Sequence, residues 1–300
     1  MDNLTHSLVG AVLGQAGLKK KTGLAMPALI IGANLPDVDA ACFFWLEGTE
    51  HLGFRRGITH GPPAMVLLPL ILAGLLWAFD WWQTKRGKRP EGRLPVHFGW
   101  LYALSFIGCL SHPALDWLNV YGVRFLEPFS SQWFYGDTLF IIDVWLWALL
   151  IASLWWSLRR EKKAGNWTKP ARIGIAAMLA YIGVNSLISF AYLPSGPRHP
   201  VTISSPVPLA FWNREVVYGS NGSYLIDNVP VGECDLAPAF AARSRDSQLD
   251  AFLFWSRAPF AVRADDGSVI LYDARFYDPR ARGRFSVALP DVKCEELDSD

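Results

Sequence analysis

The sequence predicts a mostly α-helical membrane protein, a polytopic bundle of about 5–6 membrane segments followed by a small β-rich domain. The 300-residue chain is 51% hydrophobic and only 18% charged, a balance typical of membrane proteins. Its formal net charge is +1, so no global field attracts nucleic acid. The composition changes near residue 195, which predicts a helical domain over 1–195 and a β-rich domain over 196–300. Six apolar segments carry the helical prediction: residues 4–18, 24–46, 62–83, 97–118, 138–158 and 171–193.

The apolar segments differ in length and continuity. The last four are each about 20 residues long, the length that crosses roughly 30 Å of hydrocarbon. The first is short and predicts a half-length or tilted helix, capped by Asn3 or Thr5. The second is interrupted at Pro36, which breaks the helical hydrogen-bond ladder. Broken backbone at membrane depth is tolerated only where protein buries it or where it lines a cavity.

The loops between the segments predict the orientation. Residues 19–21, 84–96 and 159–172 are rich in lysine and arginine, and the positive-inside rule therefore places them in the cytoplasm. Loops 47–61 and 119–137, both termini and the C-terminal domain are then expected on the outer side.

The C-terminal domain follows a linker rich in proline and serine. The stretches "GSNGS" and "ADDGS" lie between short apolar runs and predict two β-hairpins. Cys234 and Cys294 both lie in this domain. They could form a disulfide if the domain is extracytoplasmic, or stay as two free or buried cysteines, and the sequence leaves both open. Cys42 and Cys109 lie in apolar segments and are expected to be packing residues.

Ionisable residues in the membrane segments gather on the outer side. Such residues are rare in membrane segments and usually functional. His112 and Asp116 are four residues apart, so they share a face of a helix. Asp37 and Asp39 follow the break at Pro36, from which irregular backbone can present both carboxylates. The candidate set is His6, Asp37, Asp39, His60, His112, Asp116, Asp137 and Asp143.

Imidazole and carboxylate ligands suit zinc, and carboxylate-rich sets also suit manganese, iron or magnesium. Two such ions can clamp a phosphoester and supply a nucleophile. Arg55 and Arg56 could bind the phosphate as a fork, or anchor lipid headgroups. Asp37 or Asp143 could serve as the general base.

Each element also has a purely structural interpretation. His6 alone would suit a hydrogen-bonded packing residue, and "NLPDVD" alone would suit a turn with aspartate caps. "HPALD" alone and Asp143 would suit structural polar contacts. The predicted position of all these residues on the outer side of the membrane favours a functional site.

Four motifs resemble one family. "THSLVG", "NLPDVD", "RRGITHG" and "SHPALDW" are similar to motifs of the YdjM-like family, LexA-regulated bacterial inner-membrane proteins described as metal-dependent hydrolases. The resemblance covers roughly residues 1–195, in the same order. It implies a multi-pass protein of the inner membrane that hydrolyses a phosphoester. It also implies zinc as the cofactor and a set of ligands or near-ligands: His6, Asp37, Asp39, His60, His112 and Asp116.

Three hypotheses follow. The first is a membrane-embedded, metal-dependent hydrolase of a phosphoester or other ester at the outer membrane face, with a lipid or lipid-linked substrate. The second is an ion-coupled transporter, because intramembrane carboxylates and a broken helix also mark coupling-ion sites. The third is a membrane scaffold for a C-terminal domain that binds a partner.

Overall fold

The computed structural model describes residues 1–194, 199–277 and 285–297. The chain forms two compact units. The helical unit comprises residues 1–38, 56–186 and 208–211, and the β-rich unit comprises residues 39–55, 187–207 and 212–300.

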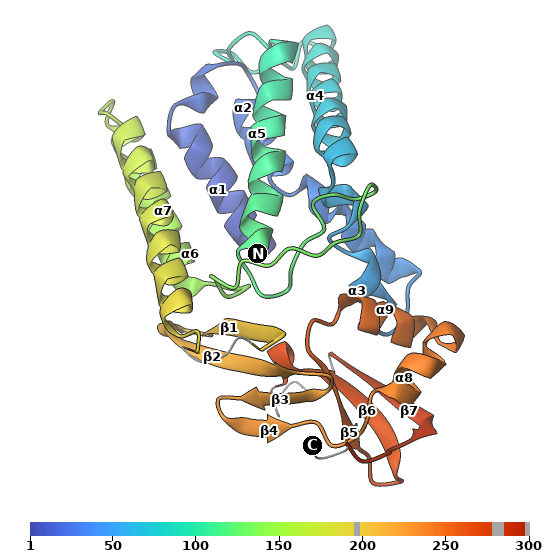
Figure 1. Cartoon of the computed structure of the whole chain (residues 1–300). Coiled ribbons are helices and arrows are strands. Elements are labelled where there is room, and N and C mark those ends of the chain that lie inside the picture. The colour runs from blue at the N-terminus through green and yellow to red at the C-terminus, as the bar shows by residue number, and fades with distance from the viewer. Residues whose placement is uncertain (195–198, 278–284, 298–300) are drawn as a thin grey trace. The chain divides into compact units, whose positions relative to one another are not determined.

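The helical elements follow the apolar segments (Figure 1). Short 3₁₀ helices at Leu18–Lys20, Leu35–Phe44 and Ile58–His60 connect them. The α-helices are α1 (Asn3–Gln15), α2 (Ala25–Gly32), α4 (Pro62–Lys85), α5 (Phe98–Trp117), α6 (Val144–Lys162) and α7 (Thr168–Ala191).

The number of membrane segments is smaller than the sequence predicts. Among the described residues, α4, α5 and α7 are long and apolar enough to cross a membrane. The pair Ala25–Gly32 and Leu35–Phe44, bent by 51°, would make a fourth if it counts as one span. The described residues therefore support three or four segments rather than the expected 5–6. At 13 residues, α1 extends only about 20 Å, and α6 ends in the charged run Arg159, Arg160, Glu161 and Lys162.

Two glycines let α1, α2 and α5 pack backbone to backbone. A Cβ on Gly10 would lie 2.7 Å from the Leu29 carbonyl oxygen, and a Cβ on Gly108 would lie 2.6 Å from the same atom. Small residues permit such close helix approaches in membrane proteins. His6 precedes Gly10 by four residues and His112 follows Gly108 by four, so each histidine lies on the packed face of its helix.

The basic loops meet at one end of the helical unit. Lys19 forms an ion pair with Glu161, and the Lys20 ammonium lies 4.9 Å from the centre of the Trp167 ring. Thr22 donates a hydrogen bond to the carbonyl oxygen of Pro95 at 3.3 Å. Since α1 and α5 run in opposite directions between the two ends, the start of α1 and the end of α5 lie at the opposite end.

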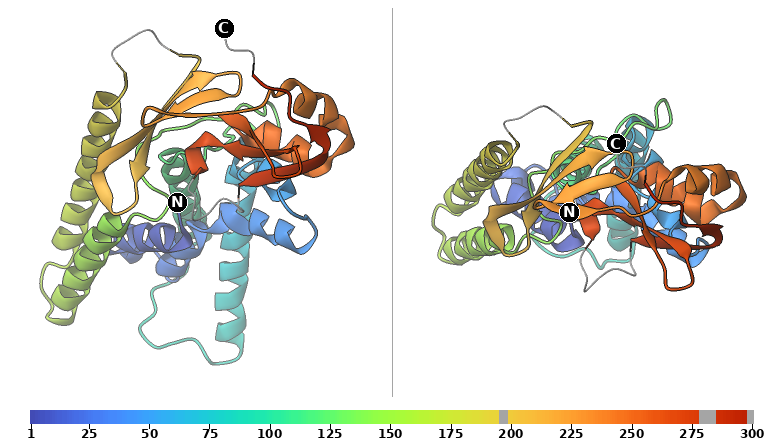
Figure 2. Two further views of the ribbon diagram at one scale, coloured as in Figure 1. Left: turned by 90° about the horizontal axis from the view of Figure 1, so that it is seen from below. Right: turned by 60° about the horizontal axis from the view of Figure 1, so that its bottom comes forward.

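The β-rich unit contains two antiparallel sheets (Figures 1 and 2). Both predicted hairpins are present: Ser220 pairs with Ser223 across Asn221 and Gly222, and Arg263 pairs with Val269. The first sheet has the order β1 (Val201–Val207), β2 (Ala210–Ser220), β3 (Ser223–Ile226) and β4 (Val229–Val231). The second has the order β5 (Pro259–Arg263), β6 (Ser268–Asp273) and β7 (Ser286–Lys293). The helices of the β-rich unit are α3 (Glu50–Phe54), α8 (Ala237–Ala242) and α9 (Ser247–Trp255), and 3₁₀ turns lie at Arg243–Arg245 and Ala274–Phe276.

Two covalent or ionic contacts tie the β-rich unit together. Cys234 and Cys294 form a disulfide, which resolves the alternative that the sequence leaves open. Cys42 and Cys109 are free and buried, as expected for packing residues.

Arg275 donates from Nε to Asp273 Oδ1 at 2.8 Å and from Nη2 to Oδ2 at 2.9 Å, and both side chains are fully buried. Burial alone would raise the pKa of the Asp273 carboxyl, but the Arg275 charge and the hydrogen bonds from Arg275 and Ser256 lower it below its usual value.

Candidate metal centre

The last turn of α5 carries the first two residues of the site. His112 Nε2 lies 3.5 Å from Asp116 Oδ2, because residues four apart share a helix face. His112 Nδ1 lies 2.7 Å from the carbonyl oxygen of Ala33. A carbonyl oxygen only accepts hydrogen bonds, so Nδ1 carries a proton, and Nε2 is the nitrogen that faces Asp116.

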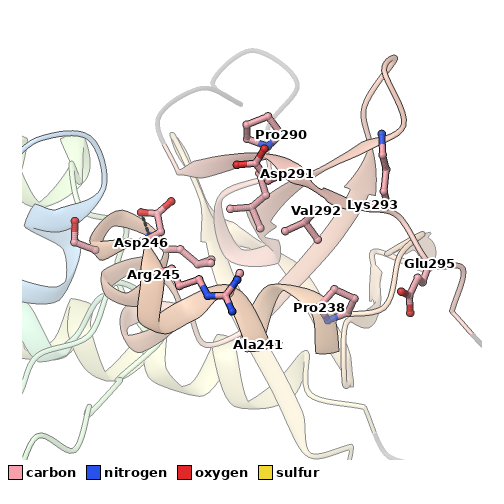
Figure 3. Close-up of a pocket in the computed structure, with 13 residues that line it drawn as sticks. Pro238, Ala241, Arg245, Asp246, Pro290, Asp291, Val292, Lys293 and Glu295 are labelled. Atoms are coloured by element: carbon pink, nitrogen blue, oxygen red, sulfur yellow. Dashed lines mark hydrogen bonds between the residues drawn. The ribbon is translucent and has the colours of Figure 1, made fainter.

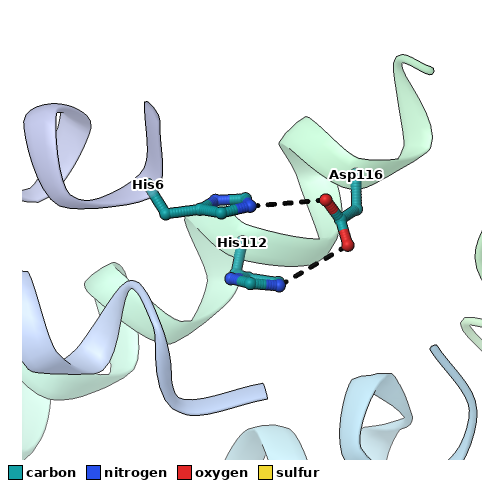
Figure 4. Close-up of side chains that lie close together, drawn as sticks. All are labelled: His6, His112 and Asp116. Carbon is teal, nitrogen blue, oxygen red and sulfur yellow. Dashed lines mark ion pairs between the residues drawn. The ribbon is translucent and has the colours of Figure 1, made fainter. Parts of the chain in front are cut away.

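His6 on α1 stacks against His112. Their ring centroids are 3.7 Å apart with an interplanar angle of 16°, and His6 Nε2 lies 3.3 Å from Asp116 Oδ1 (Figure 4). The start of α1 is fixed by Asp2, whose side chain accepts hydrogen bonds from the amides of Leu4 and Thr5. The cap therefore sets the position of His6, one turn into the helix.

His60 and Asp37 come from the irregular segments. His60 ends the 3₁₀ turn before α4, and its Nε2 lies 3.4 Å from Asp116 Oδ2. Its Nδ1 contacts the Thr59 hydroxyl at 3.0 Å. Asp37 follows Pro36, and its Oδ1 lies 3.8 Å from His112 Nε2. Asp116 is thus surrounded by three imidazoles from three separate segments.

These residues form two groups with the spacing of metal ligands. In one group the candidate ligand atoms of His6, His112 and Asp116 lie within 4.8 Å of one another. In the other the same holds for Asp37, His60 and His112, so His112 belongs to both.

The donor set fits a metal cation. His6 Nδ1, His6 Nε2 and His112 Nε2 are buried and make no hydrogen bond within the described part of the chain. Unsatisfied buried nitrogens cost roughly 1–3 kcal/mol each, and a cation between them would remove that cost. The fixed tautomer of His112 is the arrangement usual for metal-ligating histidines, whose second nitrogen is held by a carbonyl or carboxylate.

Arg56 is the main cationic partner of Asp116. Its Nε lies 3.1 Å from Asp116 Oδ2, and its Nη1 donates to Asn119 Oδ1 at 3.0 Å and to the Gly122 carbonyl at 3.2 Å. The guanidinium carbon lies 4.5 Å from the centre of the Tyr121 ring. The Met1 amino group contacts the same carboxylate. These cations offset part of the cost of burying Asp116.

A sequence model of the YdjM inner membrane protein family matches residues 1–191. The chain belongs to this family. The match confirms the resemblance carried by the four motifs, all of which lie within the matched residues.

One curated relative of the chain shows a shorter likeness. A stretch of 141 residues is 28% identical to the uncharacterized protein YfhP of Bacillus subtilis strain 168. It covers 44% of this chain and 39% of that protein, so the chain spans well under half the length of the relative. No solved structure matches the chain.

Three residues expected in the site have other partners in the structure. Asp39 and Arg55 belong to the β-rich unit, where Arg55 Nε donates to Asp39 Oδ1 at 3.4 Å. Asp143 caps α6: it accepts hydrogen bonds from the amides of Trp145 and Leu146, and from the Tyr181 hydroxyl at 2.9 Å. Among the described residues, neither metal-type group includes Asp39 or Asp143.

The β-rich unit has a hollow of a different character (Figure 3). It is built by α8, α9 and β7, and its charged lining residues are Arg245, Asp246, Asp291, Lys293 and Glu295. Charges of both signs line it, and none of its residues belongs to a metal-type group in the described parts of the chain. In the described parts of the chain, both metal-type groups lie in the helical unit.

The sequence did not predict the residues that hold the candidate ligands in place. Asn119 lies three residues after Asp116, so helical spacing alone could have suggested it. The pairing of Arg56 with Asp116 joins residues that are 60 positions apart, and the acceptor from Ala33 is a backbone atom, so no local signal marks either contact.

Proposed function

We propose that the His–Asp cluster binds a divalent metal ion and that the protein is a membrane-embedded, metal-dependent hydrolase. The observation that carries the proposal is the convergence of His6, His60 and His112 on Asp116, with the tautomer of His112 fixed by Ala33. Zinc suits a set of imidazoles and carboxylates best, and manganese and iron are alternatives.

The chain's own residues have distinct proposed roles. A divalent ion held by His6, His112 and Asp116 would supply Lewis-acid activation of an ester and of water. Asp37 is the candidate general base, because its side chain is 10% exposed against 1% for Asp116. Arg56 would hold Asp116 in place. Arg55 remains the candidate for binding a substrate phosphate.

The proposed substrate is a phosphoester or another ester, carried by a lipid or a lipid-linked molecule. The family is one of inner membrane proteins, so a substrate within the bilayer can reach the site by lateral diffusion. The cluster lies at the end of the helical unit opposite the basic loops. If those loops are cytoplasmic, as the positive-inside rule predicts, the reaction takes place at the outer face.

The C-terminal domain is proposed to be extracytoplasmic. The chain enters α7 at the basic end and leaves it at the other end, before the β-rich sheets begin. The disulfide between Cys234 and Cys294 supports the same side, because disulfides persist in oxidising compartments.

Hydrolysis assays test the proposal. The purified protein, loaded with zinc or manganese and placed in lipid, is expected to hydrolyse at least one substrate from a panel of phospholipids and soluble phosphodiesters. Asp37→Asn is expected to lower kcat by roughly 100-fold or more. His97→Ala is the control, since His97 precedes α5 at the basic end. Absence of hydrolysis by the loaded wild-type protein across the panel would contradict the proposal.

Ion-coupled transport is the second candidate, favoured by one observation. The 51° bend between Ala25–Gly32 and Leu35–Phe44 places Asp37 beside broken backbone, and broken helices often carry coupling ions. Proton or cation flux in proteoliposomes that disappears in Asp37→Asn and Asp39→Asn would favour transport over hydrolysis.

A further inference from the structure

A groove at the C-terminal end of α6 has a lining of cations and tryptophans. The lining residues are Trp155, Trp156, Arg159, Arg160, Lys163 and Gly165. Three side chains carry positive charge and the lining contains no acidic residue. The electrostatics of the groove therefore suit an anion.

Each arginine of the groove lies over a tryptophan one turn earlier. The guanidinium carbon of Arg159 is 4.8 Å from the centre of the Trp155 ring, and that of Arg160 is 5.6 Å from the centre of the Trp156 ring. Cation–π contacts of this kind occupy the face of a guanidinium, while its N–H donors lie in the plane. The N–H groups of the stacked arginines therefore point away from the tryptophan rings, where they can donate hydrogen bonds to a ligand.

The groove cations lack carboxylate partners. Within the described residues, Arg159, Arg160 and Lys163 form no ion pair, whereas their neighbour Glu161 pairs with Lys19. Two arginines of the 84–96 loop differ: Arg89 and Arg93 both pair with Asp80, at 3.2 and 2.9 Å. In the described part of the chain, the C-terminal end of α6 therefore carries a cluster of positive charges without carboxylate partners.

The groove lies beside the basic end of a helix that is long and apolar enough to cross a membrane. Ser153 of α6 donates to the Pro170 carbonyl of α7 at 3.1 Å, so the end of α6 lies beside the start of a helix that is long enough to cross the membrane. On the same helix, Ile151 is 48% and Trp155 is 58% exposed. An apolar exposed face that ends in cations is suited to acyl chains below a charged headgroup.

We propose that this groove binds the phosphate of an anionic phospholipid in the leaflet on the basic side. Arg159 and Arg160 would bind the phosphate oxygens and Lys163 would add charge. The acyl chains would lie along the exposed apolar face of α6. The site is independent of the proposed metal centre, which lies at the other end of the helical unit.

Lipid retention by the full-length protein tests this proposal. The protein is purified from liposomes that contain equal phosphatidylglycerol and phosphatidylcholine, and the bound lipids are counted by native mass spectrometry. Arg159→Gln/Arg160→Gln is expected to lower the retained phosphatidylglycerol by roughly tenfold or more. The matched control is Lys85→Gln/Arg86→Gln. It removes the same charge on the same side, from cations that lie 4.0 and 4.6 Å from Trp81 and Trp82 on α4.

Several results would overturn the proposal. One is an equal loss in the groove variant and in the control, which would indicate diffuse surface attraction. Another is the absence of any preference for phosphatidylglycerol in the wild-type protein. A third is displacement of the lipid by millimolar inorganic phosphate, which would identify a soluble anion as the occupant. If the double variant does not fold, Arg159→Gln and Arg160→Gln are measured singly, and each is expected to lower retention about threefold.

Discussion

The imidazole of His112 donates a hydrogen bond from Nδ1 to the carbonyl oxygen of Ala33 across 2.7 Å. This contact joins α5 to the end of α2 and fixes which nitrogen of His112 faces Asp116. It also connects the fold to the proposed chemistry, because Gly32 and Gly108 allow the two helices to approach closely enough for the bond. A larger residue at either position would separate the bond partners.

Cobalt titration of single variants should distinguish the two metal-type ligand groups of the cluster. His6→Ala removes a ligand from one group and His60→Ala from the other, whereas His112→Ala removes a ligand from both. We expect titration with Co²⁺, followed by visible absorption, to show weaker binding in His6→Ala and His60→Ala, and the largest loss in His112→Ala. Equal binding in His112→Ala and the wild-type protein would contradict the shared role of His112.

Replacing Arg56 should destabilise the metal-free protein. Arg56→Gln leaves the buried Asp116 with less compensating charge, and breaking a buried ion pair typically costs about 3–5 kcal/mol. We expect a lower unfolding temperature in detergent, partly restored by saturating zinc, because a cation at Asp116 would replace the lost charge. The control is Arg89→Gln, whose pair with Asp80 is more exposed. An unchanged unfolding temperature would argue against the role of Arg56.

The β-rich domain should lose stability in acid through Asp273. The pKa of this carboxyl is lowered in the folded state, mainly by Arg275 against the opposing effect of burial. Its contribution is therefore present above the unfolded pKa of about 3.9 and is lost as the pH falls through the lowered folded value. Trp255, whose ring lies 4.6 Å from the Arg275 guanidinium, provides a fluorescence signal for unfolding.

Asp273→Asn serves as the comparison for this pH dependence. We expect the variant to be less stable near pH 7 and to lose less further stability on acidification below pH 4. Asp250→Asn, which affects an exposed ion pair, is expected to behave like the wild-type protein. Identical acid unfolding of the wild-type protein and Asp273→Asn would show that this pair does not control the transition.

Thiol counting should report two reactive cysteines before reduction and four after it. Cys42 and Cys109 are free, whereas Cys234 and Cys294 are joined. The measurement is alkylation of the denatured protein, purified from bacterial membranes, followed by intact mass analysis. Because the disulfide spans 60 residues, Cys234→Ser/Cys294→Ser is expected to cost the domain about 2–5 kcal/mol. Four thiols without reduction would place the domain in a reducing compartment.

The sequence predicted the helices α4, α5 and α7 well, and α6 and the strands of the β-rich domain less well. The apolar runs 62–83, 97–118 and 171–193 correspond to α4, α5 and α7. The run 138–158 was displaced, because Asp143 caps the helix and delays its start to Val144. Only two hairpins of the β-rich domain were predicted. The two-residue turn Asp227–Asn228 between β3 and β4 was missed, although both of its residues favour turns.

The candidate site was predicted where local spacing and intramembrane polarity coincide. His112 and Asp116 follow from helical periodicity, and His6, His60 and Asp37 follow from their place in apolar or broken segments. The contacts that organise these residues are long-range. Arg56 could be assigned to Asp116 only once the fold was known, because pairing across 60 residues leaves no periodic signal.

The metal content of the purified protein tests the central claim most directly. Wild-type protein, His60→Ala/His112→Ala and the control His97→Ala are purified in detergent and analysed by elemental mass spectrometry. We expect stoichiometric zinc, manganese or iron in the wild-type protein and in His97→Ala, and a loss of at least about tenfold in the double variant. Equal metal in all three proteins, or none in any of them after reconstitution, would contradict the metal centre.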